Sequence, residues 1–147
     1  MDNVLTQTFD TLSTHQLYDI LKLRAEVFVV EQQSIYLDVD SMDRDAIHIS
    51  LYDQHRLVGY ARILPPGTRF KEASVGKIVL QKDTRGKGNG RKLVTLAITE
   101  SQQRFHTPIR IEGQTYLQTF YESFGFNTVG KPYIWDGVEH IEMLLAA

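Results

Sequence analysis

Cysteine is absent from the 147-residue chain. Its absence excludes a disulfide framework, a thiolate zinc site and a catalytic thiol, so any nucleophile must come from the substrate or from an oxygen or nitrogen side chain. Long apolar runs are absent too, because none approaches the roughly 18 residues that would span a bilayer. The opening residues MDNVLTQTFDTL lack the basic and apolar regions of a signal peptide. We therefore expect a cytoplasmic protein with no membrane partner.

The chain also lacks an excess of charge of one sign. Its 16 Lys and Arg oppose 18 Asp and Glu, giving a formal net charge of −2, so we expect no nucleic-acid partner. The five histidines are scattered without a His-Glu-x-x-His pattern. The acidic run Asp38, Asp40, Asp43 and Asp45 lacks the glycine and distal glutamate of a calcium loop. We expect no metal site and interpret the acidic run as a solvated loop.

The composition that remains is typical of a folded domain. Apolar residues make up 42% of the chain and charged residues 23%, close to the average for globular proteins. The length suits one hydrophobic core, and no repeat or linker interrupts it. We predict a single domain over residues 1–147.

The pattern of apolar residues predicts alternating helices and strands. Ser13 and Gln16 form a capping box, and apolar residues recur at helical spacing, which predicts a helix from residue 14 to about 31. A polar segment follows it. The other predicted elements are a hairpin over 46–64, a strand over 73–80, a helix over 93–104, a strand over 109–112, a helix over 115–124 ended by Gly125, and a closing hairpin over 133–145 with its turn at Asp136-Gly137. The order indicates a mixed α/β arrangement around one sheet.

The most informative residues form the turn between the strand over 73–80 and the next helix. Four residues after the strand, the chain reads Arg85-Gly86-Lys87-Gly88-Asn89-Gly90-Arg91. A glycine-rich turn at a helix N-terminus gathers main-chain N–H groups at one point and attracts phosphate. Neither the Walker A pattern nor the dinucleotide fingerprint fits these glycines. The turn therefore predicts a polyanionic ligand without either of those nucleotide folds.

With its strand VGKIVL and the spacer Gln81 to Thr84, this turn resembles the GNAT superfamily of N-acetyltransferases. The family motif, R/Q-x-x-G-x-G/A after a strand of the form IGRVAV, matches in register. The resemblance implies one mixed, mostly antiparallel sheet of six or seven strands flanked by about four helices, with acetyl-coenzyme A as co-substrate. It implies that coenzyme A is bound by the following residues: Ile78, Val79, Leu80, Arg85, Gly86, Lys87, Gly88, Asn89, Gly90, Arg91 and Gln114.

A second segment, Gln114 to Phe126, resembles the family pattern N-x-x-A-x-x-F/L-Y-x-x-x-G-F. Gln114 replaces the usual asparagine. Tyr121 stands at the tyrosine that lies near the coenzyme sulfur in many members, so the resemblance implies that Tyr121 is the general acid. The segment from Leu23 to Gln32, followed by Tyr36, Asp38, Asp40 and His48, is similar to the ElaA-like branch.

The general base is left open by the sequence. Candidates are Glu31, Glu112, His48 and His140, each of which can transfer a proton directly or through water. A main-chain N–H after Lys77 is the candidate for stabilising the oxyanion.

The acceptor pocket has its own candidates in the first helix and the segment after it. Since that segment forms one wall of the pocket in the family, the resemblance implies that the following residues bind substrate: Arg24, Glu26, Asp38 and His48. An alternative is that Arg24, Glu26, Glu31 and Asp38 form a structural ion-pair network that holds the helix to the loop.

Three functions agree with these observations. The first is an N-acetyltransferase that acts on a primary amine of a small molecule or peptide by direct attack in a ternary complex. The second is a non-catalytic acyl-coenzyme A-binding or sensor module. The third is a nucleotide- or RNA-binding domain that uses the same basic turn. The resemblance also leaves a homodimer open.

Overall fold

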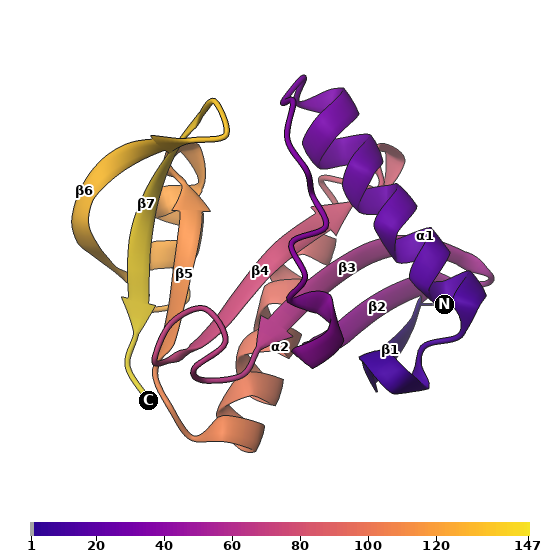
Figure 1. Ribbon diagram of the computed structural model, residues 1–147, viewed down its shortest axis with the longest axis horizontal. Helices are drawn as coiled ribbons and strands as arrows, with labels where there is room; N and C mark the ends of the chain where they lie inside the picture. Colours follow the sequence, from indigo (N-terminus) through magenta and orange to yellow (C-terminus); the bar gives the residue numbers. More distant parts are fainter. Residues whose placement is uncertain (1) are drawn as a thin grey trace.

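One seven-stranded sheet organises the chain, with the strand order β1-β2-β3-β4-β5-β7-β6. It is seen in a computed structural model that describes residues 2–147 (Figure 1). The strands are β1 (Asp2–Thr8), β2 (Ile47–Asp53), β3 (Arg56–Leu64), β4 (Ala73–Leu80), β5 (Ile109–Gln114), β6 (Asn127–Trp135) and β7 (Val138–Leu145). The helices are α1 (Thr14–Arg24), α2 (Asn89–Phe105) and α3 (Gln118–Glu122), with a π-helical segment η2 (Ala25–Glu31) and short 3-10 turns η1 (Phe9–Thr11), η3 (Asp43–Asp45), η4 (Lys82–Thr84) and η5 (Thr115–Leu117).

All strand pairs are antiparallel except β4 and β5, which run parallel. These two strands pair only at their first residues, Ala73 with Ile109 and Ser74 with Arg110. Beyond that point they separate, as Figure 1 shows. We call this unpaired stretch, residues 75–80 of β4 and 111–114 of β5, the splay. Here each strand keeps one edge of main-chain donors and acceptors free of the other strand.

Helices α1 and α2 cover opposite faces of the sheet (Figure 1). On one face, Leu93, Val94 and Ala97 of α2 join the larger core cluster. On the other face, Ile20 and Leu23 of α1 pack in a smaller cluster with residues of β3 and β4.

Gly59 on β3 makes the close approach of α2 to the sheet feasible. A Cβ at this position would lie 2.8 Å from Leu93 Cδ1 and 2.9 Å from Leu80 Cδ2, so a larger residue would push the helix or the neighbouring strand away. The position of α2 matters for function because its N-terminus carries the glycine-rich turn.

The structure confirms the mixed, mostly antiparallel sheet and both hairpins, including positive φ at Asp136 and Gly137. It also confirms the capping box, in which Ser13 Oγ accepts from Gln16 N–H at 3.0 Å and Gln16 Oε1 accepts from Ser13 N–H at 2.9 Å. About four helices were predicted, and three α-helices occur in residues 2–147.

Several boundaries differ from the prediction. Strand β1 was not predicted, because its few apolar residues become a strand only by pairing along β2. The predicted helix over 115–124 is divided into η5 and α3, and α2 begins at Asn89, so Gly90 lies in its first turn. The second half of the predicted helix over 14–31 is π-helical. No helix in residues 2–147 is long and apolar enough to cross a bilayer.

Candidate functional site

The glycine-rich turn is open and built from main chain. Gly86 and Gly88 have φ of +77° and +83°, a region that residues with a Cβ rarely adopt. A Cβ at either position would meet no atom within 4 Å, and residues 85–88 are exposed. No side chain of the described chain therefore fills the space in front of these two glycines.

The first turn of α2 supplies the donors. Gly88 occupies the N-cap position without a side-chain cap, and the first helical bond there runs from Lys92 N–H to Gly88 C=O. The N–H groups that precede Lys92 in this turn have no helical carbonyl to pair with, and they form the positive end of the helix dipole. With Lys87 and Arg91 nearby in sequence, the turn suits the phosphates of a polyanionic ligand.

Most polar side chains of the turn bind the protein itself. Arg85 forms a two-pronged ion pair with Glu31, at 2.6 and 3.0 Å, and also donates to Leu80 C=O at 3.1 Å. Asn89 Nδ2 donates to Thr84 C=O at 3.2 Å. These bonds fix the loop, which leaves main-chain N–H groups as the donors that face outward.

Arg91 connects α2 to the segment after β5. Its guanidinium donates to Ser123 Oγ at 2.5 Å and lies 4.4 Å from the centre of the Phe124 ring. The turn is thus held from two sides, by η2 through Glu31 and by the end of α3 through Ser123.

Strand β4 carries a bulge at the start of the splay. Lys77 has φ +50°, and the β3–β4 register passes from Tyr60–Val79 to Arg62–Gly76, so one extra β4 residue is accommodated. Val79 beyond the bulge is buried against α1. The Val79 side chain therefore belongs to the core and does not line the splay.

Tyr121 lies against β5. A Cβ on Gly113 would be 3.2 Å from Tyr121 Cδ2 and Cε2, so the glycine provides the room for the ring. Burial raises the pKa of the Tyr121 hydroxyl to about 12, which keeps its proton in place at neutral pH. Within residues 2–147 the hydroxyl makes no hydrogen bond to another residue, so its proton is not committed to a protein acceptor.

The base candidates Glu31 and Glu112 are engaged. Arg85 hydrogen-bonds Glu31 and lowers the pKa of that carboxyl, which weakens it as a base. Glu112 accepts from Arg69 Nε at 2.5 Å and from Tyr133 Oη at 2.7 Å.

His140 is arranged differently. Its Nδ1 lies 2.7 Å from Val138 C=O. A carbonyl only accepts, so Nδ1 carries the hydrogen and Nε2 of the neutral ring has the free lone pair. His140 pairs with Gln114 in the β5–β7 register, at the open end of the splay.

Tyr121 and His140 border β5 from opposite faces. Tyr121 contacts Gly113, whose β7 partner Ile141 is buried in the core. The next pair, Gln114 and His140, lies on the other face because strand side chains alternate. An acid and a base placed in this way could act on a group lying in the splay from its two sides.

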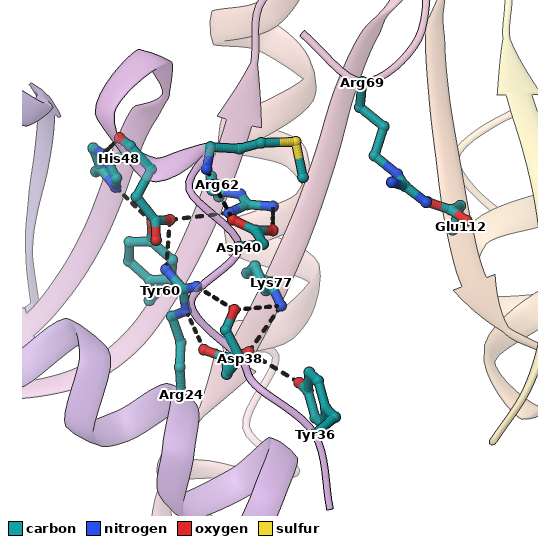
Figure 2. A network of polar contacts seen from close by, with 12 residues as sticks. Arg24, Tyr36, Asp38, Asp40, His48, Tyr60, Arg62, Arg69, Lys77 and Glu112 are labelled. Carbon is teal, nitrogen blue, oxygen red and sulfur yellow. Dashed lines mark hydrogen bonds and ion pairs between the residues drawn. The ribbon is translucent and has the colours of Figure 1, made fainter. Parts of the chain in front are cut away.

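The predicted substrate-binding residues Arg24, Asp38 and His48 belong to a buried polar network (Figure 2). Arg24 and His48 are both 0% exposed. Arg24 bonds Asp38 at 2.8 Å and Asp43 at 2.7 Å. His48 lies between Tyr60 Oη at 2.6 Å and Asp43 C=O at 2.9 Å. The alternative of a structural ion-pair network is thus confirmed for Arg24 and Asp38, whereas Glu31 pairs with Arg85 and Glu26 with Lys22. Arg24 and His48 have no surface with which to touch a ligand.

The network continues onto β3 and β4. Arg62 bonds Asp40 at 2.8 Å and Asp43 at 3.0 Å, and Lys77 bonds Asp38 at 2.8 Å. Burial alone would raise the pKa of Asp38, but the charges of Arg24 and Lys77 outweigh burial and lower it. The interpretation of the acidic run as a solvated loop is wrong for Asp38 and Asp43, which are buried. The sequence contains no signal for the pairing of Arg62 with Asp40 and Asp43 or of Lys77 with Asp38, because these contacts join distant segments.

Glu26 is separate from these residues. It is exposed, forms an ion pair with Lys22 at 3.7 Å and lines a cavity of about 330 Å³ between α1 and the β2–β3 turn. Its substrate contact stays a prediction. No group of three or more His, Asp or Glu in residues 2–147 is arranged to hold a metal ion.

Comparison with known proteins agrees with this geometry. A family model for the acetyltransferase (GNAT) domain matches residues 11–147. The crystal structure of an acyl-CoA N-acyltransferase from Pseudomonas aeruginosa superposes with a TM-score of 0.95, at 32% identity, covering 99% of this chain and all of that one. The chain therefore belongs to the GNAT acetyltransferase family.

Its relatives place it more narrowly in the ElaA-like branch, as the N-terminal segment predicts. Escherichia coli ElaA is 37% identical over 135 residues, which cover 90% of this chain and 88% of ElaA. The ElaA crystal structure superposes with a TM-score of 0.92 and covers 99% of each chain. A UPF0039 protein of Synechocystis is 41% identical over 140 residues, covering 94% of this chain and 91% of that protein.

Proposed function

We propose that this protein is an acetyl-coenzyme A-dependent N-acetyltransferase that acylates a primary amine of a small molecule or peptide by direct attack. The observation that carries the proposal is the open turn of Gly86 and Gly88 at the N-terminus of α2, next to the splay. Family membership supports an acyl-coenzyme A as donor. The proposal goes beyond family membership in three points: the donor carries an acetyl group, the acceptor is a primary amine and the protein is cytoplasmic.

In the proposed complex, the N–H groups from Gly86 to Arg91 bind the phosphates of the coenzyme. The main chain of Ile78, Val79 and Leu80 pairs with the pantetheine arm along the free edge of β4. Gln114 Nε2 donates to Gln32 Oε1 at 3.3 Å, so the two side-chain amides lie together at the end of the splay.

The proposed chemistry uses one group from each face of β5. His140 Nε2 removes the proton from the attacking amine, since the oxygens of Glu31 and Glu112 are engaged. The N–C bond forms as the C–S bond of the thioester breaks, and the electron pair leaves on sulfur. Tyr121 donates the proton that the thiolate takes up.

Two measurements test the proposal. Titration calorimetry should show micromolar binding of acetyl-coenzyme A, and a thiol assay should show coenzyme A release with at least one member of an amine panel. Absence of binding would contradict the proposal. Binding without turnover across the panel would instead favour the alternative, a non-catalytic acyl-coenzyme A-binding or sensor module.

Replacing Tyr121 with Phe separates binding from chemistry. The ring stays against Gly113, so the dissociation constant of acetyl-coenzyme A should change less than about twofold, whereas kcat should fall about 100-fold because the acid is lost. Tyr18→Phe, an exposed position on α1, is the matched control and should keep both values. A Tyr121→Phe enzyme with unchanged kcat would remove Tyr121 from the mechanism.

A further inference from the structure

The bulge of β4 holds a lysine in a conformation that lysine rarely adopts. Lys77 has φ +50° in the middle of a strand, a left-handed conformation that is strained for a residue with a Cβ. Such a conformation persists only where the surrounding contacts determine it, and it is common at functional sites. The contacts of Lys77 therefore show what maintains the bulge.

The Lys77 ammonium is held at one point by residues from outside its strand. Its Nζ donates to Asp38 Oδ1 at 2.8 Å and lies 3.3 Å from Asp38 C=O. The rings of Phe28 and Tyr36 lie 5.8 and 5.5 Å from the ammonium, close enough for cation–π attraction. The side chain is 17% exposed, so solvent weakens these contacts only partly.

Asp38 is itself fixed. Arg24 Nε donates to its Oδ2 at 2.8 Å, Arg24 Nη2 to its C=O at 3.2 Å and Tyr36 Oη to its Oδ1 at 2.9 Å (Figure 2). Arg24 is completely buried on α1 and also bonded to Asp43. A shift of the Lys77 ammonium would thus require a shift of a buried ion pair.

The bulge lies where the proposed reaction occurs. Beyond Ser74 the strand is no longer paired with β5, so the main chain after Lys77 borders the splay. We propose that Lys77 is a positioning residue, whose ion pair with Asp38 sets the bulge of β4 and thereby aims the main-chain N–H of Ile78 at the reacting carbonyl. This inference rests on the proposed function for its effect on catalysis, but its effect on the bulge can be measured without substrate.

The ion pair also fixes the segment after η2. Tyr36 and Asp38 point inward to the network, whereas Ile35 and Leu37 are exposed. Ser34 Oγ of the same segment donates to Asp136 C=O at 2.6 Å, in the β6–β7 turn. Lys77 therefore connects β4 to a segment that also reaches the far side of the splay.

The experiment compares Asp38→Asn with the matched control Asp40→Asn. Both substitutions remove a carboxylate from the same segment, the one that follows η2. Asp40, however, accepts hydrogen bonds from Arg62 and not from Lys77. In amide spectra recorded without ligand, Asp38→Asn should move the peaks of Ile78 and Val79, which lie about 40 positions away, and Asp40→Asn should leave them in place. Unmoved peaks in Asp38→Asn would overturn the proposal, whether or not the protein is an active enzyme.

The catalytic part uses Lys77→Met and Lys77→Gly. Methionine keeps the Cβ but loses the charge, whereas glycine loses the charge and also relieves the backbone strain. Both should lower kcat by at least about tenfold, since small misplacements cost this much, while the dissociation constant of acetyl-coenzyme A stays within about twofold. A purely structural role would instead make activity follow stability, with Lys77→Gly the more active of the two. That result, or full kcat in either variant, would overturn the proposal.

If Asp38→Asn does not fold, amide peaks of Lys77→Met at Gly76 and Val79, which do not directly follow the substituted residue, replace that readout. Peaks unchanged from the wild type would again contradict the proposal. A wild-type protein that binds acetyl-coenzyme A without turnover would contradict the proposed function but not the role of Lys77 in shaping the bulge.

Discussion

The turn that leads into α2 and the network around Arg24 both border the splay, but they are built in opposite ways. The turn is exposed, formed by consecutive residues and based on main-chain donors. The network is buried and consists of side chains, in which Arg24, Arg62 and Lys77 face Asp38, Asp40 and Asp43 across α1, the following segment, β3 and β4.

The difference indicates how the two tasks of the site are divided. The first turn of α2 has N–H groups without a helical carbonyl partner, so it can receive an anion from outside. In the network three cations are matched by three carboxylates, so the network has no net charge to offer a ligand. Its role is instead to hold α1, the following segment, β3 and β4 in position. Substitutions in the turn should therefore weaken binding of the coenzyme and change the packing of the fold little. Substitutions in the network should mainly lower the free energy of unfolding.

The largest expected effect is on stability in the network. Arg24→Met leaves buried Asp38 and Asp43 each without one partner, so the free energy of unfolding should fall by about 3–5 kcal/mol in urea titrations. Arg56→Met is the control, because the Arg56–Asp83 pair is 52% and 66% exposed and should contribute little. Equal stability of the two variants would show that the network does not hold the fold.

The next effect is on catalysis. His140→Gln should lower kcat about 100-fold, because the variant has no imidazole to take the proton from the amine. The control is His15→Gln, an exposed position on α1, which should keep the wild-type kcat. Wild-type kcat in His140→Gln would assign the base to another residue.

A smaller effect is expected in the turn. Gly88→Ala should weaken binding of acetyl-coenzyme A about tenfold, since alanine at φ +83° is strained by roughly 1–2 kcal/mol and its methyl group faces the ligand. Gly130→Ala on β6 has a similar φ of +76° and also no atom within 4 Å of its Cβ. It should lose similar stability and keep its affinity for the coenzyme. Equal affinities in the two variants would argue against phosphate binding at the turn.

The smallest effect concerns pH. Burial lowers the pKa of His48, so near and below about pH 6.5 the unfolded chain binds more protons than the folded one. The free energy of unfolding should therefore decrease as the pH is lowered. Between pH 7 and 6 the contribution is about 0.7 kcal/mol or less. His48→Gln, which keeps a donor toward Asp43 and an acceptor toward Tyr60, should lack this component in urea titrations. The same pH dependence in both proteins would exclude His48 as its source.

The same contrast explains what the sequence could predict. The turn, the capping box at Ser13 and the Asp136-Gly137 hairpin depend on residues close together in the chain, and the structure confirms these local features. Strand β1 could not be predicted, because its pairing with β2 decides its conformation.

Most partners in the network could not be predicted for a related reason, although an ion-pair network with Arg24 and Asp38 was one of the alternatives. Asp38 and Lys77 are 39 positions apart, and neither carries a local pattern that indicates the other. Arg24 and Asp38 were selected by family resemblance as substrate contacts, whereas the fold brings them to each other. The π-helical form of η2 and the split between η5 and α3 also depend on packing that hydrophobic periodicity does not encode.

The central claim, that main-chain amides of the turn bind an acyl-coenzyme A, is tested most directly by titrating the ¹⁵N-labelled protein with acetyl-coenzyme A and following its amide peaks. The largest shifts should occur from Gly86 to Arg91 and at Ile78 to Leu80, and Gly88→Ala should reduce them at equal ligand concentration. Saturable binding with these peaks unmoved would contradict the account, because the ligand would then be held elsewhere on the protein.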